Sequence, residues 1–151
     1  MPCPHCKITI IKRSNNESAV SAAAYQSGEK LCSDYDQEQK YYPYKTEATR
    51  KEIMLPPHAP PEYADRNILW NSAEAQEKQW NSQIAWRFVL AIPREIPPGQ
   101  YADLLRDYCR EFFVSKGMID DFAIHDKGDG TPRPYPEILL IWKWIATAQV
   151  E

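Results

Sequence analysis

Short β-branched or apolar runs alternate with helix-patterned segments along this chain, and their order constrains the fold more than any single motif. Residues 6–13 (CKITIIKR) alternate polar and β-branched side chains, which is typical of a strand. Residues 19–27 are rich in alanine, and we expect a short helix there with Ser18 as its N-cap and Gly28 as its stop. The other expected elements are a hairpin arm at 35–43, strands at 52–55, 84–92 and 121–126, a strand or a buried tail at 138–145, and helices at 60–79 and 98–116.

This order of elements reads β-α-β-β-α-β-α-β-β. Strands and helices interleave, some strands are adjacent along the chain, and no glycine-rich phosphate loop or internal repeat interrupts the pattern. The pattern predicts an α+β fold: a two-layer sandwich with a mostly antiparallel sheet and helices packed on one face. With 151 residues, of which 43% are hydrophobic, the chain is long enough for one domain with a real core.

The charge balance excludes a protein that is basic over its whole surface. The formal net charge is −3, so contact with nucleic acid would need a local basic patch. Lys7, Lys12 and Arg13 provide such a cluster around the first expected strand. The alternative for these side chains is an ordinary solvated surface.

The start of the chain carries no apolar stretch, so we expect no signal peptide. The longest apolar run, residues 138–142, is far shorter than the roughly 20 residues of a membrane helix. These observations predict a cytoplasmic protein without membrane contact, whose four cysteines are reduced thiols.

The motif CPHC at residues 3–6 offers an alternative use for two of these cysteines, because paired cysteines at this spacing can bind zinc or exchange disulfides. A redox pair normally follows a strand and precedes a helix, whereas here a strand follows. A zinc site would need a second close pair, and Cys32 and Cys109 are isolated. Incidental thiols are the favoured interpretation.

Two residues are candidates for chemistry. Tyr25 lies among small side chains in SAVSAAAYQSGEK, and small neighbours let a large substrate approach a helix. A tyrosyl hydroxyl can attack phosphorus and form a covalent intermediate. His125 ends an apolar run and is followed by an Asp- and Gly-rich turn. The alternatives are a half-buried packing tyrosine and a strand-end histidine beside a hairpin loop.

The chain resembles the MobA/MobL family of plasmid mobilisation relaxases. The resemblance begins with HCKITIIKRSNNESAVSAAAYQSGEKL at residues 5–31 and continues, in order and without large gaps, to residue 132. Its later parts include DYDQEQKYYPYK, LAIPREI and FVSKGMIDDFAIHDKGDGTP. A run of this length is far more specific than any single motif within it.

The resemblance implies a DNA strand-nicking enzyme that acts at a plasmid's transfer origin. In such relaxases a tyrosine attacks the scissile phosphate and becomes linked to the 5′ end, while three histidines hold one divalent cation, Mg²⁺ or Mn²⁺. Carried over by position, the nucleophile falls on Tyr25 and one metal ligand on His125. Implied partners are single-stranded DNA and accessory mobilisation proteins. The residues expected to contact DNA phosphates are Lys7, Lys12, Arg13 and Lys127.

This sequence departs from the family in two segments of the site. Arg133 and Tyr135 stand where the family has the two histidines of a His-Ala-His motif. Arginine does not deprotonate to bind a cation, and a protonated tyrosine is a poor ligand. The second departure puts Trp86 and Arg87 where the family commonly has Arg-Glu after an alanine, so a basic side chain replaces an acidic one. We therefore predict impaired cation binding and impaired nicking.

A frameshift near Pro132 would explain the lost histidines. One choice of codons for residues 132–136, read one base later, encodes His-Ala-His-Ile-Leu, so the nucleotide sequence of the gene tests this hypothesis. It divides the chain into a relaxase-like domain, residues 1–132, and a divergent tail, residues 133–151, whose prolines would place the start of the tail at a sheet edge or in a loop. The alternative function is a catalytically inactive remnant of a relaxase that still binds single-stranded DNA.

Overall fold

The computed structural model describes residues 6–42, 48–92, 95–125 and 137–144. Five strands form one sheet in the order β1-β5-β7-β6-β4, and every neighbouring pair is antiparallel. Their bounds are β1 Cys6–Lys12, β4 Ala48–Met54, β5 Gln83–Ala91, β6 Met118–His125 and β7 Glu137–Trp144. Two short strands, β2 (Leu31–Cys32) and β3 (Gln39–Lys40), form a separate hairpin. The sheet confirms the predicted α+β class.

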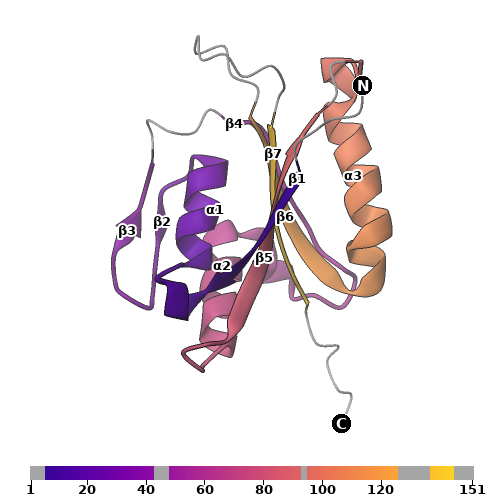
Figure 1. The fold of residues 1–151 in the computed structure, drawn as a ribbon. Coiled ribbons are helices and arrows are strands. Elements are labelled where there is room, and N and C mark those ends of the chain that lie inside the picture. Colours follow the sequence, from indigo (N-terminus) through magenta and orange to yellow (C-terminus); the bar gives the residue numbers. More distant parts are fainter. Residues whose placement is uncertain (1–5, 43–47, 93–94, 126–136, 145–151) are drawn as a thin grey trace.

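Helices cover both faces of the sheet (Figure 1). Helices α1 (Ala19–Ser27) and α2 (Arg66–Gln76) lie on one face, and α3 (Tyr101–Phe112) lies on the other. The described residues also form four short 3-10 helices: η1 (Arg13–Asn15), η2 (Pro61–Ala64), η3 (Pro98–Gln100) and η4 (Val114–Lys116). The expectation of helices on one face therefore holds for α1 and α2 and is wrong for α3.

The position of α3 follows from the strands, because β6 and β7 are apolar on both sides. Ile119 and Ile141 pack toward α1 and α2, whereas Phe122 and Leu140 pack toward α3. All four side chains are almost completely buried. Two apolar faces need two covering layers, so the sheet lies between two hydrophobic clusters.

The first helix has the predicted bounds, and local signals explain both ends. The Ser18 hydroxyl accepts a hydrogen bond from the amide of Ser21 at 3.2 Å, and Gly28 ends the helix with a φ of 74°. The long helix expected at residues 60–79 is divided instead. Pro61 begins η2, and α2 begins only after Asp65, whose carboxylate accepts from the backbone amides of Asn67 and Ile68.

The last described strand is central, not peripheral. β7 pairs with β5 on one side and β6 on the other. The expectation that the start of the tail lies at a sheet edge or in a loop concerns residues before β7 and stays a prediction. The side chains of β7 explain its central position: Ile138, Leu139, Leu140 and Ile141 are all buried, and an apolar run of this kind fits a strand covered on both faces. The prolines at 132, 134 and 136 lie outside the described residues.

A buried ion pair fixes α2 to the sheet. The Arg66 guanidinium donates to both carboxylate oxygens of Asp121, at 2.7 and 2.9 Å, and the Trp70 indole donates to the same carboxylate at 2.8 Å. A second carboxylate, that of Glu29, contacts Arg66 at 2.8 Å. The carboxylate of Asp121, on β6, accepts from two side chains of α2. These buried hydrogen bonds therefore set the position of α2 over β6.

Candidate functional site

Tyr25 lines a pocket between α1 and the β1–β5 side of the sheet. The pocket has a volume of about 350 Å³ and is lined by Ile11, Asn16, Glu17, Ser18, Ser21, Ala22, Tyr25, Tyr42 and Arg87. The α1 residues at positions 18, 21, 22 and 25 follow helical spacing, so they form one stripe of small side chains that ends at Tyr25. The Tyr42 ring meets the Tyr25 ring edge-on, with 6.0 Å between centroids. This arrangement leaves the tyrosine half-buried beside an open space.

Two hydrogen bonds dock the last turn of α1 onto β6. The side-chain amide of Gln26 donates to the backbone carbonyl of Asp121 at 2.8 Å, and His125 Nε2 lies 2.8 Å from the backbone carbonyl of Gln26. Gln26 and His125 are 1% and 5% exposed. Because Tyr25 and Gln26 are consecutive, the contacts that hold Gln26 against the sheet also fix the direction of Tyr25.

The described residues do not form a complete cation site around His125. A carbonyl oxygen can only accept, so His125 Nε2 carries a hydrogen in this arrangement and cannot coordinate a cation at the same time. In the parts of the chain that the structure describes, no three His, Cys, Asp or Glu side chains gather as metal ligands do. Arg133 and Tyr135 lie outside those parts. His125 also does not line the Tyr25 pocket.

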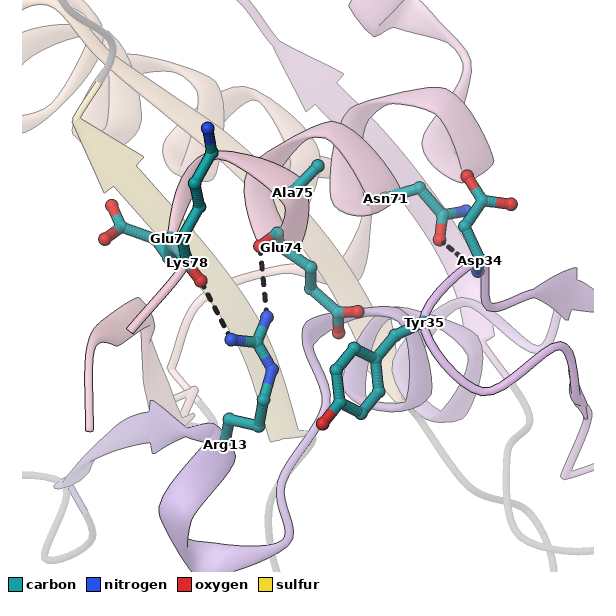
Figure 2. A pocket seen from close by; sticks show the side chains of 8 residues that line it. All are labelled: Arg13, Asp34, Tyr35, Asn71, Glu74, Ala75, Glu77 and Lys78. Atoms are coloured by element: carbon teal, nitrogen blue, oxygen red, sulfur yellow. Dashed lines mark hydrogen bonds between the residues drawn. The ribbon is translucent and has the colours of Figure 1, made fainter. Parts of the chain in front are cut away.

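The predicted DNA-binding residues have different roles. Arg13 donates to the backbone carbonyls of Glu77 and Glu74, at 2.8 and 3.1 Å, and its guanidinium lies 4.7 Å from the centre of the Tyr35 ring. Figure 2 shows both bonds at the end of α2, so Arg13 closes that helix. Lys7 is exposed, Lys12 is half-buried, and Lys127 lies outside the described residues.

The pocket around Arg13 is unsuited to a phosphate backbone. Its lining has three acidic side chains and two basic ones: Asp34, Glu74, Glu77, Arg13 and Lys78. One of the two basic side chains, Arg13, already donates hydrogen bonds to carbonyls at the end of α2 (Figure 2). Excess carboxylates repel the phosphates of a nucleic acid. Of these two pockets, the Tyr25 pocket is the better candidate for a DNA contact.

Arg87 stands where the resemblance predicts an acidic residue, and the sequence alone assigns it no role. The strand register makes Arg87 the partner of Thr9 on β1 and of Ile141 on β7, on the sheet face that carries α1. Trp86 points to the other face, where it stacks on Trp142 with 4.8 Å between ring centres. The shared pocket of Arg87 and Tyr25 depends on β1–β5 pairing, which no local sequence pattern reveals.

The two described cysteines whose side chains are placed are thiols: Cys32 is exposed and Cys109 is buried. Cys3 and the side chain of Cys6 lie outside the described residues, so the structure does not test a zinc or redox use of CPHC. Among the described residues, no helix has the length and apolar character needed to cross a bilayer.

The fold and site define a class: an α+β protein with helices on both faces of an antiparallel sheet, in which a tyrosine on the first helix lies next to the residue that contacts a histidine on β6. The MobA/MobL family model matches residues 17–146. The chain therefore belongs to the MobA/MobL family, as the resemblance predicted.

The relatives carry names from plasmid transfer. The chain is 31% identical to "Probable mobilization protein MobA" of Bifidobacterium longum, over 90% of this chain and 24% of that protein. It is 32% identical to "Conjugal transfer protein TraA" of Agrobacterium fabrum, over 83% of this chain and 12% of TraA. The chain thus spans a quarter or less of either relative.

A solved structure also matches the fold. It is described as "Molecular Basis of Vancomycin Resistance Transfer in Staphylococcus aureus", and it superposes with a TM-score of 0.81 at 27% identity. The match covers 92% of this chain and 69% of the solved one. The family match runs beyond residue 132, through β7, so the sequence similarity includes the strand that the frameshift hypothesis assigned to the tail.

Proposed function

We propose that this chain acts in plasmid mobilisation as a relaxase-type domain that binds single-stranded DNA at a transfer origin, with Tyr25 as the residue aimed at the DNA backbone. The observation that carries the proposal is the position of Tyr25, held by Gln26 and opening into a pocket with a cationic side chain. The family membership and the names of the relatives support the same role.

The reaction open to Tyr25 is transfer of a DNA phosphoryl group. Its phenolic oxygen would attack phosphorus, the bond from phosphorus to the 3′ oxygen would break, and the leaving strand would take up a proton as a 3′ hydroxyl. The product is a 5′ phosphotyrosine that retains the bond energy needed for rejoining. The residues of this chain position the nucleophile. Gln26 holds the last turn of α1 against β6, and the Tyr42 ring packs edge-on against the Tyr25 ring.

We propose that nicking is weak in this chain. Two family histidines are replaced by Arg133 and Tyr135, and the carbonyl of Gln26 occupies one nitrogen of His125. A divalent cation is the group that would offset the charge developing on the phosphate in an intact relative. The described residues do not complete a site for it.

A covalent-adduct assay tests the proposal. Labelled single-stranded oligonucleotides that tile the DNA next to the gene are incubated with the protein and Mn²⁺ or with chelator, and adducts are resolved on denaturing gels. We expect oligonucleotide binding in both conditions and little adduct, so that Tyr25→Phe and the matched control Tyr42→Phe behave alike. A strong Mn²⁺-dependent adduct that disappears in Tyr25→Phe alone would refute weak nicking while supporting Tyr25 as nucleophile.

The second candidate function is the non-catalytic remnant, and the carboxylate-to-arginine change at position 87 favours it, because a fixed cation strengthens phosphate binding without supplying chemistry. The same assay separates the two functions. Binding without any adduct, even at high Mn²⁺ and long incubation, identifies the remnant, and a slow adduct dependent on Tyr25 identifies a weakened enzyme. Failure to bind any oligonucleotide would exclude both.

A further inference from the structure

Arg87 is a half-buried cation whose Nε atom has no hydrogen-bond partner among the described residues. That atom is itself buried, and no carboxylate in the described chain forms an ion pair with Arg87. By contrast, Arg66 and Lys143 on the same side of the sheet are paired with carboxylates at 2.7 and 2.9 Å. An unpaired guanidinium N–H in a protein interior costs free energy, so its retention calls for a partner from outside the fold.

A second unpaired group lies beside the first. Thr9 is the register partner of Arg87 across the β1–β5 pair, and its hydroxyl is also buried without a hydrogen-bond partner among the described residues. A guanidinium and a hydroxyl both donate hydrogen bonds, and Arg87 lines the Tyr25 pocket. The neighbouring strands therefore present two unsatisfied polar groups on the face of the sheet beneath α1.

The chemistry of the pocket selects an anion as its ligand. Arg87 and Glu17 are its charged lining residues, and one oxygen of Glu17 already accepts from the backbone amide of Lys12 at 3.0 Å. The other polar lining side chains are the uncharged Asn16, Ser18, Ser21, Tyr25 and Tyr42. Each carries a donor group, although the Ser18 hydroxyl already donates to Glu74 at 2.6 Å. Arginine binds phosphate oxygens through two parallel N–H groups, a geometry that lysine lacks.

We propose that the pocket between α1 and the β1–β5 pair binds a phosphate group of single-stranded DNA, and that Arg87 is its principal ligand. The inference rests on the proposed function, which supplies the DNA, but it assigns a site that the family's acidic residue at this position could not form. Arg87 places a permanent positive charge in the same pocket as the Tyr25 hydroxyl, independently of any bound cation.

Inorganic phosphate tests the site without DNA. The Nε–H resonance of Arg87 is assigned in a ¹⁵N-labelled sample from its loss in Arg87→Lys, and the protein is titrated with phosphate or with chloride at matched ionic strength. We expect the Arg87 resonance to shift and saturate with phosphate and to respond little to chloride. An Arg87 resonance that responds identically to both salts would overturn the proposal.

Salt-dependent DNA binding provides the second test. A fluorescent 12-nucleotide single strand is titrated with the wild-type protein, with Arg87→Gln and with Arg110→Gln, a control on the exposed side of α3. Loss of one phosphate contact predicts roughly tenfold weaker binding for Arg87→Gln and a slope of log K against log salt that is smaller by about 0.7. Arg110→Gln should match the wild type.

The two tests distinguish this site from the proposed function. If the wild type binds the oligonucleotide and Arg87→Gln changes neither affinity nor slope, the Arg87 site is refuted and the function stands. If no oligonucleotide binds but phosphate still shifts Arg87, the site stands and the DNA-binding function fails. Because Arg87→Gln could destabilise the sheet, its melting curve and that of Arg87→Lys are compared with the wild type. Weak binding by a folded Arg87→Gln supports the site.

Discussion

At the scale of residues, two adjacent carboxylates on β6 have opposite environments. Asp121 faces α2 and accepts from Arg66 and Trp70, whereas Asp120 faces α3 and lies buried with no well-formed hydrogen bond among the described residues. Burial raises the pKa of Asp120 to about 8, against an opposing effect of the Cys109 thiol. The alternation of side chains along a strand places these two neighbouring carboxylates on opposite faces of the sheet.

Asp120 makes stability depend on pH. Its folded-state pKa lies above the unfolded value of 3.8, so the folded protein keeps a proton that the unfolded chain releases, and the free energy of unfolding falls as pH rises from about 4 to about 8. The fall attributable to Asp120 is roughly 1.4 kcal/mol per pH unit. Asp120→Asn removes this pH dependence. The free energy of unfolding in urea should therefore be higher for the variant than for the wild type, by an amount that is larger at pH 7.5 than at pH 5. Parallel pH profiles for variant and wild type would contradict this assignment.

Asp121 should be far more sensitive to truncation than an exposed aspartate. Asp121→Ala leaves the Arg66 guanidinium and the Trp70 indole without their buried acceptor, and loss of one partner of a buried ion pair costs about 3–5 kcal/mol. The matched control is Asp103→Ala, because Asp103 forms an exposed i,i+3 contact with Arg106 and such pairs contribute less than about 1 kcal/mol. Denaturant unfolding of both variants measures the difference, and equal losses would show that the buried pair does not brace α2.

At the scale of elements, sequence signals predict what depends on neighbours along the chain. The bounds of α1 follow from Ser18, the alanine run and Gly28, and the structure agrees with them. The division of the helix expected at residues 60–79 was missed, although its prolines and the Asp65 cap are local features that could have revealed it. The placement of α3 on the opposite face was also missed, because it depends on which strands are apolar on both sides, and that emerges only from the assembled sheet.

The residues of the candidate site also differ in whether the sequence could reveal them. Tyr25 and His125 were found from their local context and the family resemblance, and the structure brings His125 to the residue that follows Tyr25. Arg87 lies 62 positions after Tyr25 in the chain, so its place in the same pocket depends on long-range pairing of β1 with β5. The assignment of Arg13 to DNA likewise could not anticipate that the end of α2 would take up its hydrogen bonds.

Arg13 and Lys7 should therefore respond differently to the loss of charge. Arg13→Gln removes two charge-assisted bonds to α2 carbonyls, and we expect a loss of stability of about 1–3 kcal/mol. Lys7→Gln alters an exposed side chain, so its stability should change by less than about 0.5 kcal/mol while single-strand binding weakens at low salt. Thermal melts and oligonucleotide titrations of both variants check this. An Arg13→Gln protein with unchanged melting and weakened binding would restore Arg13 as a DNA contact.

At the scale of the whole molecule, the sheet is assembled from segments that are far apart in sequence, and the last strand joins them. β7 forms hydrogen bonds with β5 and with β6, so without it the sheet divides into a β1–β5 pair and a β6–β4 pair. Leu140 and Ile141 also contribute to the hydrophobic clusters on the two faces. Whatever the reading frame of its codons, this strand holds the Tyr25 pocket to the half of the sheet that carries His125.

Removal of β7 should consequently abolish folding, even though residues 1–132 contain the longest run of family resemblance. A chain that ends at Pro132 leaves unpaired the backbone groups of two central strand edges and exposes the apolar sides of β5 and β6, and such losses exceed the net stability of a typical domain. A chain that ends at Trp144 keeps every described strand and serves as the control. We expect cooperative thermal unfolding by circular dichroism for the control and for the full chain, and none for the shorter one. A sharp melting transition in the 1–132 chain would show instead that the relaxase-like domain closes its sheet without β7, and that the residues after Pro132 are a dispensable tail.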